Sequence, residues 1–144
     1  MAFRGNYEHS LDAKNRLSIP AKFRASFSSG VVLAKDAEPC VAVWTPEQHE
    51  RIIETALEGR NPLDPARKRI ARYFQANSFE QELDSAGRVT LPPQLLAHAG
   101  AHKEVVVAAV GDHLEVWSRE RWAEEASALD ADIVGLTEGL GHPS

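Results

Sequence analysis

A tandem duplication constrains the fold of this chain more than any other feature of its sequence. Segment 11–20, LDAKNRLSIP, recurs 72 positions later as segment 83–92, LDSAGRVTLP. Both copies place an aspartate four residues before an arginine, and a small hydroxyl residue between two aliphatic residues precedes a proline in each. A second match follows, in which segment 43–45, VWT, corresponds to segment 116–118, VWS, at an offset of 73. The one-residue difference predicts a single insertion in a loop.

The duplication divides the 144 residues into units of about 70. A unit of this size is marginal as an independent fold, so we expect the halves to pack against each other or against another chain. The single cysteine, Cys40, excludes an internal disulfide and is expected to be a buried, inert thiol in an apolar run. No segment resembles a signal peptide or a membrane span, which predicts a cytoplasmic protein.

Each copy predicts about four strands and one short helix, followed by a longer helix. Alternating apolar and polar residues indicate opening strands. A proline at the end of each repeated motif favours a short helix directly after it, because proline fixes φ near the helical value. The predicted strands are 3–7, 16–19, 31–34, 40–44, 78–83, 88–91, 105–110 and 114–117, and the predicted helices are 21–27, 46–57, 65–74, 93–99 and 119–129.

This pattern divides the chain into four parts. Residues 1–60 form the first repeat, which carries the candidate DNA-contacting hairpin, and residues 61–76 form a basic linker helix. Residues 77–130 form the second repeat, and residues 131–144 are predicted to be a flexible tail.

The Asp-x-x-x-Arg motif predicts a tight turn between two strands. Its aspartate can accept hydrogen bonds from the turn amides or pair with the arginine, which would hold the loop in one shape. Asn15 and Gly87 can adopt the left-handed conformation that such a turn requires. A structural ion pair is therefore one interpretation of the motif, and we assign this role to Asp12, Asp84 and Arg88.

A second interpretation is DNA contact by the first motif. Lys14 and Arg16 make the first turn more basic than the second, which has Ala86 and Arg88 at these positions. A basic β-hairpin can enter the major groove, where arginine contacts guanine and lysine neutralises phosphate. Basic residues nearby could add contacts, although an ordinary solvated surface explains them equally well; they are Arg4, Lys22 and Arg24.

The charge of the chain is unevenly distributed. The net charge is −5, which argues against a nucleic-acid partner, but residues 1–30 contain five basic and only two acidic side chains. A second basic run, Arg67 to Arg69 with Arg72, is more simply explained as the exposed face of a helix whose apolar residues pack inward. The three tryptophans are expected to fill the core or the contact between repeats.

Sequence features of catalysis are missing. The six histidines are scattered, and Gly100 interrupts the only pair at helical spacing, His98 and His102. No glycine-rich phosphate loop, zinc-binding motif or serine elbow is present. We therefore expect no enzyme activity, no cofactor and no metal site.

The two motifs, the opening Phe3-Arg4-Gly5 and the Val-Trp pairs that close each half resemble the MraZ family. The resemblance implies an α+β, mainly β fold: two AbrB/SpoVT-like swapped-hairpin halves in one pseudosymmetric, double-psi-like small barrel with peripheral helices. It also implies a homo-oligomeric ring, with an octamer expected. In the family pattern the arginine of the first motif, here Arg16, is the main DNA contact, and Lys14 and Asn15 assist. Asn15 stands where the family often has glycine.

The resemblance further implies a nucleoid-associated transcriptional regulator, commonly a repressor. Such regulators bind short direct repeats in double-stranded DNA upstream of their own division and cell-wall gene cluster. An alternative that the residues leave open is an oligomeric protein-interaction scaffold of the same fold. In that case the hairpins and the acidic C-terminal helix would serve assembly or partner docking.

Overall fold

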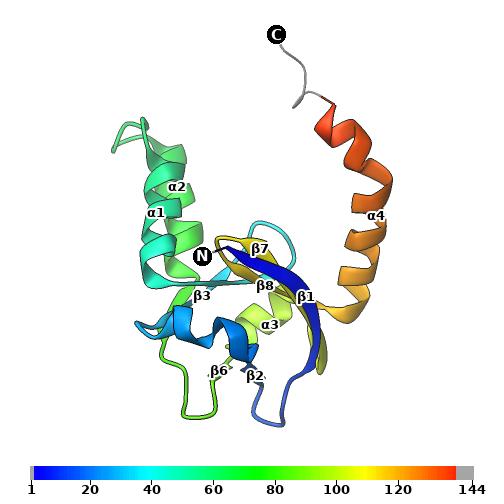
Figure 1. The fold of residues 1–144 in the computed structure, drawn as a ribbon. Helices are drawn as coiled ribbons and strands as arrows, with labels where there is room; N and C mark the ends of the chain where they lie inside the picture. The colour runs from blue at the N-terminus through cyan, green and yellow to red at the C-terminus, as the bar shows by residue number, and fades with distance from the viewer. Residues whose placement is uncertain (1, 139–144) are drawn as a thin grey trace.

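The two repeats form corresponding elements in the same order, with a 3-10 helix in the first repeat where the second has an α-helix (Figure 1). The computed structural model describes residues 2–138. The first repeat forms β1 (Phe3–Ser10), β2 (Arg16–Ser18), the 3-10 helix η1 (Ala21–Phe27), β3 (Val31–Lys35), β4 (Val41–Trp44) and α1 (Pro46–Leu57), and α2 (Pro65–Ala76) follows it. The second repeat forms β5 (Ser78–Gln81), β6 (Arg88–Thr90), α3 (Pro93–Ala99), β7 (Glu104–Gly111), β8 (Leu114–Ser118) and α4 (Arg119–Thr137).

Proline and hydroxyl residues determine where the helices begin. Pro20 precedes η1 and Pro92 precedes α3, so the short helices expected after the repeated prolines are confirmed. The hydroxyls of Thr45 and Ser118 each accept a hydrogen bond from the backbone N–H three residues further on, at 3.3 and 3.2 Å. These N-caps satisfy amides at the starts of α1 and α4 that would otherwise have no partner within the helix.

The repeats exchange strands with each other. An antiparallel six-stranded sheet has the order β1-β7-β8-β4-β3-β5, so each edge strand pairs with a strand of the other repeat. β2 and β6 form a separate two-stranded sheet, with Leu17 opposite Val89. The expectation that each motif joins two mutually paired strands was therefore wrong. The strands on either side of each turn belong to different ladders, and those ladders connect the two repeats.

The mixed α+β character is confirmed. The expectation of a mainly β fold was wrong, because α1, α2 and α4 are long and the helices of residues 2–138 contain more residues than the strands. The resemblance also implies a small closed barrel, and the strand pairing of residues 2–138 shows no such closure. Within residues 2–138 the ladders leave β1 and β5 at the two edges of an open sheet.

One hydrophobic core contains side chains from both repeats. Leu17 and Ile19 are fully buried beside their counterparts Val89 and Leu91, while the alternating positions 16, 18, 88 and 90 lie at or near the surface. Burial of apolar area is the main driving force of folding, and here neither half holds a complete core. The expected packing of the halves against each other is confirmed.

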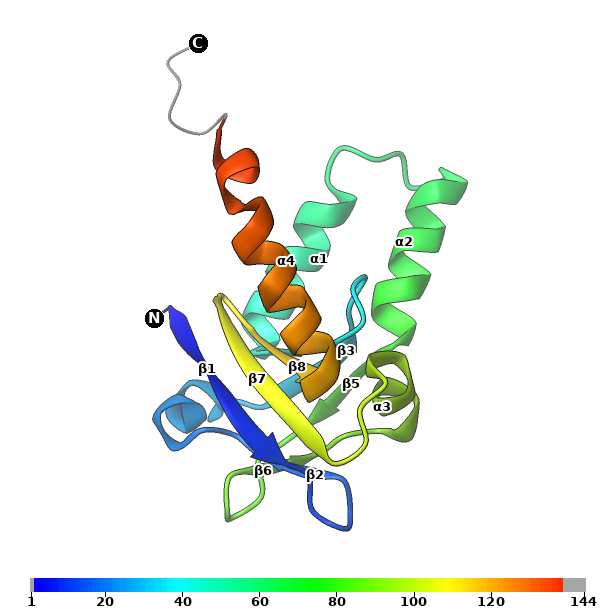
Figure 2. The same ribbon diagram turned by 90° about the vertical axis from the view of Figure 1, so that its right-hand side faces the viewer.

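The three long helices, α1, α2 and α4, extend toward the end of the molecule opposite the two motif turns (Figures 1 and 2). Figure 1 shows α1 and α2 side by side on one flank and α4 on the other. α4 continues to Thr137, beyond the expected end at residue 129, so part of the predicted flexible tail is helical. Residues 139–144 of that tail lie outside the described residues. Among the helices of residues 2–138, none is long and apolar enough to cross a membrane.

Candidate nucleic-acid interface

Two loops project together from one end of the molecule, beyond the small β2–β6 sheet (Figures 1 and 2). We call residues 12–16 the first loop and residues 84–88 the second loop. Each leads into a strand of the small sheet, and those strands pair residue by residue from Arg16 opposite Thr90 to Ser18 opposite Arg88. This pairing fixes the position of one loop relative to the other.

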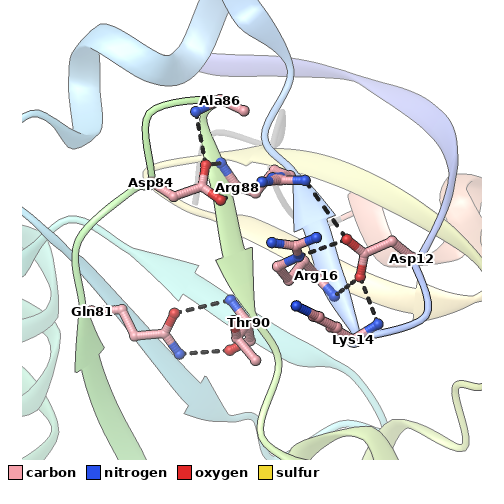
Figure 3. A network of polar contacts seen from close by, with 8 residues as sticks. All are labelled: Asp12, Lys14, Arg16, Gln81, Asp84, Ala86, Arg88 and Thr90. Carbon is pink, nitrogen blue, oxygen red and sulfur yellow. Dashed lines mark hydrogen bonds and ion pairs between the residues drawn. The ribbon is translucent and has the colours of Figure 1, made fainter.

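An aspartate organises the first loop. Asp12 Oδ1 accepts hydrogen bonds from the backbone N–H groups of Lys14 and Arg16, at 2.9 and 2.8 Å. Its Oδ2 accepts a bond from Arg16 Nε at 2.6 Å (Figure 3). The carboxylate thus closes the turn and holds the arginine side chain. Because Nε makes this bond, the two terminal guanidinium nitrogens of Arg16 remain available; within residues 2–138 they make no hydrogen bond.

The second loop repeats this geometry. Asp84 Oδ1 accepts from the N–H groups of Ala86 and Arg88, both at 2.9 Å, and Oδ2 accepts from Arg88 Nε at 2.8 Å. Arg88 makes one further contact, because its Nη1 lies 3.8 Å from Asp12 Oδ2 in the other loop (Figure 3). One terminal nitrogen of Arg88 therefore faces a carboxylate of the protein, whereas, within residues 2–138, neither terminal nitrogen of Arg16 does.

Hydrogen bonds lower the pKa of both aspartates below the ordinary value. For Asp12 the largest contribution to the lower pKa is the bond from the Arg16 backbone N–H, supported by the Arg16 side chain. For Asp84 the bond from the Arg88 backbone N–H contributes most in the same way. Both carboxylates are consequently ionised at neutral pH, and the loops keep their charged anchors.

Backbone bonds cross between the loops. Ile19 N–H donates to Gly87 C=O at 3.0 Å, and Leu91 N–H donates to Asn15 C=O at 2.9 Å. Asn15 has a φ of 58° and Gly87 a φ of 76°, which confirms the left-handed conformation expected at both positions. Each loop is therefore held by the opposite repeat at the residue where the chain turns.

The predicted basic neighbours occupy different places. Lys22 lies on η1, and its Nζ makes a cation–π contact 4.7 Å from the centre of the Tyr7 ring on β1. Arg24 is directed toward the second loop: its Nε donates to Ile19 C=O at 2.8 Å, and a Cβ on Gly87 would lie 2.3 Å from that Nε. Arg4 stands near the start of β1, at the end of the strand away from the loops.

Sequence reasoning missed a further interaction beside the loops. The Gln81 amide donates to the Thr90 carbonyl at 2.5 Å and accepts from the Thr90 N–H at 3.0 Å, and so it pairs with the backbone as a neighbouring strand would (Figure 3). The residue at the matching position of the first repeat is His9, so the duplication contains no signal for this interaction.

Outside the loops, three side chains could approach a common cation. The ligand atoms of Asp36, Cys40 and Glu115 lie within 4.8 Å of one another. Burial raises the pKa of the Cys40 thiol, with a further contribution from Glu115, so the thiol stays protonated at neutral pH. Metal ions bind the thiolate, and this environment therefore favours the inert buried thiol that the sequence predicted.

Comparison with known proteins identifies the family. The family model described as "MraZ protein, putative antitoxin-like" matches residues 2–70 and 74–132. Proteins named "Transcriptional regulator MraZ" from Thermoanaerobacter pseudethanolicus and Ligilactobacillus salivarius are 35% and 32% identical to the chain, over 94% and 96% of both partners respectively. The chain belongs to the MraZ family. MraZ proteins are transcriptional regulators and not enzymes, in agreement with the function class that the sequence predicted.

The two matched segments of the MraZ model correspond to the two repeats. A third relative of the same name, from Thermomicrobium roseum, is 34% identical over 96% of both chains. These matches cover nearly all of the sequence, and both loops lie within them.

Proposed function

We propose that this chain binds double-stranded DNA in a sequence-specific manner and regulates transcription. The observation that carries the proposal is the first loop, which an aspartate holds in one shape and which presents Arg16 and Lys14 at an exposed end of the molecule. The relatives named as transcriptional regulators support the same function.

The geometry of the first loop suits contact with a base edge. Arg16 is bound to Asp12 through Nε, and its terminal nitrogens can donate two parallel hydrogen bonds to O6 and N7 of a guanine in the major groove. Lys14 has an exposed ammonium that would neutralise a neighbouring phosphate. Asn15 completes the loop, and Lys22 would add a phosphate contact from η1.

Three of the predicted contacts follow less directly from the structure. Arg24 lies against the second loop, where its charge would act on phosphate only if the second loop also approaches DNA. Arg4 would reach DNA only on a duplex that extends along β1. We retain Asp12, Asp84 and Arg88 as residues that hold the loops in position.

The distribution of charge removes the objection raised by the net charge of −5. Segment 124–137 of α4 contains four acidic and no basic side chains, and α4 lies at the end of the molecule away from the loops (Figure 2). Acidic surface is therefore directed away from a duplex bound at the loops. Salt screens charges that are further apart than a Debye length, about 8 Å at physiological salt, so the charges of the loop itself determine the attraction to a duplex bound there.

We further propose that several copies act together. One loop offers one arginine contact, worth about 1–3 kcal/mol, which is too little for specific binding to a genomic site. Copies joined side by side, in a ring that we expect to be an octamer, would place loops on successive direct repeats. The target that the resemblance implies is the region upstream of the chain's own gene cluster, with repression as the outcome.

The first experiment is recovery of genomic fragments on purified protein, with the Arg16→Ala variant run in parallel. We expect enrichment of a promoter that carries short direct repeats, and loss of this enrichment in the variant. Equal recovery by both proteins would contradict the assignment of Arg16, and absence of enrichment with the wild type would contradict the function.

An interaction scaffold is the second candidate function. The observation in its favour is the row of exposed apolar residues on α4, which a monomeric DNA-binding domain does not need. Salt separates the two functions. DNA affinity should fall steeply as salt rises because counterions are released on binding, whereas an apolar protein contact should change little.

A further inference from the structure

A second surface borders the first loop and comes from the other repeat. The connection between α3 and β7, residues 100–103, reaches the end of β1 from which the first loop begins (Figure 2). Leu11, the residue before the loop, donates its N–H to Lys103 C=O at 2.8 Å. His102 and Lys103 are exposed, and within residues 2–138 their side chains form no hydrogen bond or ion pair. Two basic side chains therefore stand uncommitted at the base of the loop that carries Arg16.

The α3–β7 connection is held at both ends. At the end of α3, Gly100 N–H donates to Ala97 C=O at 3.1 Å, and Ala101 N–H donates to Leu96 C=O at 3.0 Å. Gly100 has a φ of 62°, the left-handed conformation that such a helix ending requires. The bond from Leu11 holds the other end. A surface fixed in this way loses little backbone freedom when it binds a ligand.

A depression lies between this connection and the first loop. Its volume is about 460 Å³, and it is lined by Asn15 of the loop, by Leu96 and Ala97 of α3, and by His102. Within residues 2–138 no acidic side chain lines it. The floor is apolar, His102 at the rim can donate from a ring N–H, and the ammonium of Lys103 follows it in the chain. This combination suits a deoxyribose on the floor and its phosphate at the rim.

The corresponding place beside the second loop is filled by the protein itself. The offset of 72 matches Leu96 to Arg24 and Asn15 to Gly87. The guanidinium of Arg24 occupies the space beside Gly87, where its Nε donates to Ile19 C=O at 2.8 Å. Leu96 has no group that can extend in this way, and the space beside Asn15 is open. The two halves therefore differ in what can approach their loops from the side.

The matching connection in the first repeat has a different charge. Strand pairing matches residues 28–29, both serine, to residues 102–103. Ser29 lines a depression on that side together with Glu80 and Glu82, and within residues 2–138 no basic side chain lines it. A phosphate would meet two carboxylates there, whereas it would meet two basic side chains beside the first loop. Only the side of the first loop is therefore suited to a nucleic-acid backbone.

We propose that the α3–β7 connection forms the second part of the DNA interface. His102 and Lys103 bind backbone phosphates of the strand that borders the first loop, while Arg16 contacts the base edge. The major groove is about 12 Å wide, so a loop that enters it brings the flanking strands against the surface at its base. Phosphate contacts of this kind fix the register and orientation of a protein on the duplex. This inference rests on the proposed DNA binding and names the side of the loop along which the duplex runs.

Removal of both side chains from the full-length chain tests the contact. The variant carries His102→Gln with Lys103→Gln. The control, Arg60→Gln, removes the same formal charge from the exposed α1–α2 connection, far from the loops (Figure 1). Affinity is measured by fluorescence anisotropy over a series of salt concentrations. The two probes are the promoter fragment recovered with the wild-type protein and a random-sequence duplex of the same length.

We expect the double variant to reduce the slope of log affinity against log salt by about 1 for each copy bound. The reduction should be equal for both probes, because phosphates carry no sequence information. The control should keep the wild-type slope, and Arg16→Ala should instead lose the preference for the promoter fragment. The inference is overturned if the double variant keeps the wild-type slope, if it loses only that preference, or if the control lowers the slope equally. Failure of the wild type to bind either probe would contradict the proposed DNA binding itself.

A second readout locates the duplex directly. Cys40 is the single cysteine and is buried, so a cysteine introduced at the surface can be labelled selectively. Lys103→Cys and Ser29→Cys would each carry an iron chelate that cleaves nearby DNA, and urea unfolding would verify that both variants fold. We expect strong cleavage of the promoter fragment from position 103 and weak cleavage from position 29. Cleavage from position 29 that is at least as strong would overturn the inference, as would its absence from both.

Discussion

The two loops have the same backbone design and different side chains. In both, one carboxylate oxygen accepts two turn amides and the other accepts the arginine Nε, with distances that agree within 0.2 Å. The three residues between the aspartate and the arginine differ, however: Ala13-Lys14-Asn15 in the first loop and Ser85-Ala86-Gly87 in the second. The fold requires the aspartate, the arginine and one left-handed residue, so the remaining positions are free to serve recognition.

The largest expected difference between the loops is in DNA affinity. Arg16→Ala should weaken binding by about 1–3 kcal/mol for each guanine that the arginine no longer reads, multiplied over the loops that bind. Arg88→Ala should have a much smaller effect, because Arg88 Nη1 faces Asp12. Titration of both variants against an operator duplex measures this. An equal reduction for both would mean that the two loops contact DNA alike.

The next largest effect is on stability at the left-handed positions. Gly87→Ala should reduce the free energy of unfolding by at least about 1–2 kcal/mol, the cost of a left-handed alanine. The new Cβ would also displace Arg24 from Ile19 C=O. Asn15→Gly should change stability by less than about 0.5 kcal/mol. Glycine relieves the strain of the left-handed conformation but raises the conformational entropy of the unfolded chain, and these two effects nearly cancel. Urea unfolding measures both, and equal costs at the two positions would refute the comparison.

A smaller effect should appear in the salt dependence of DNA binding. Lys14→Ala should reduce the slope of log affinity against log salt by about 1 for each first loop bound, because the variant neutralises one phosphate fewer. The reciprocal change, Ala86→Lys, places the same charge on the second loop and should leave the slope unchanged. If Ala86→Lys steepens the slope, the second loop also lies against the phosphate backbone.

The smallest expected difference is in acid stability. The pKa of each loop aspartate lies below the ordinary 3.8 in the folded protein, so its contribution to stability is complete above about pH 4 and is lost as the pH falls further. Asp12→Asn and Asp84→Asn should each remove part of this pH dependence. Thermal unfolding between about pH 2.5 and 6 compares them. Asp12→Asn should have the larger effect, because Asp12 also faces Arg88.

The elements and loop anchors could be predicted from the sequence because their causes are local. A proline, a hydroxyl N-cap or an aspartate four residues before an arginine acts within one turn of its own position. The choice of strand partners could not be predicted in this way, because β1 could pair with any exposed strand of suitable pattern. The pairing with β7 depends on burying both repeats in one core, a property of the whole chain.

Other features were missed for similar reasons. Gln81 reaches Thr90 only after the swapped strands bring them together, and no counterpart exists in the first repeat. The sequence predicts Arg24 as a basic side chain free to contact DNA or solvent. In the structure its guanidinium instead lies against Gly87 of the second loop, where the glycine has no side chain to exclude it. The expected end of α4 at residue 129 was too early, because the helix continues to Thr137 and includes Gly135, although glycine costs a helix about 1 kcal/mol relative to alanine.

The crossed backbone bonds, Ile19 to Gly87 and Leu91 to Asn15, have a consequence for evolution. If the two halves were separate identical chains, every substitution in one loop would appear in both and would have to satisfy both positions at once. Covalent fusion removes this constraint, because each half is encoded independently. Lys14 can then be selected in one loop, while Ala86 leaves the structural role of the other loop unchanged.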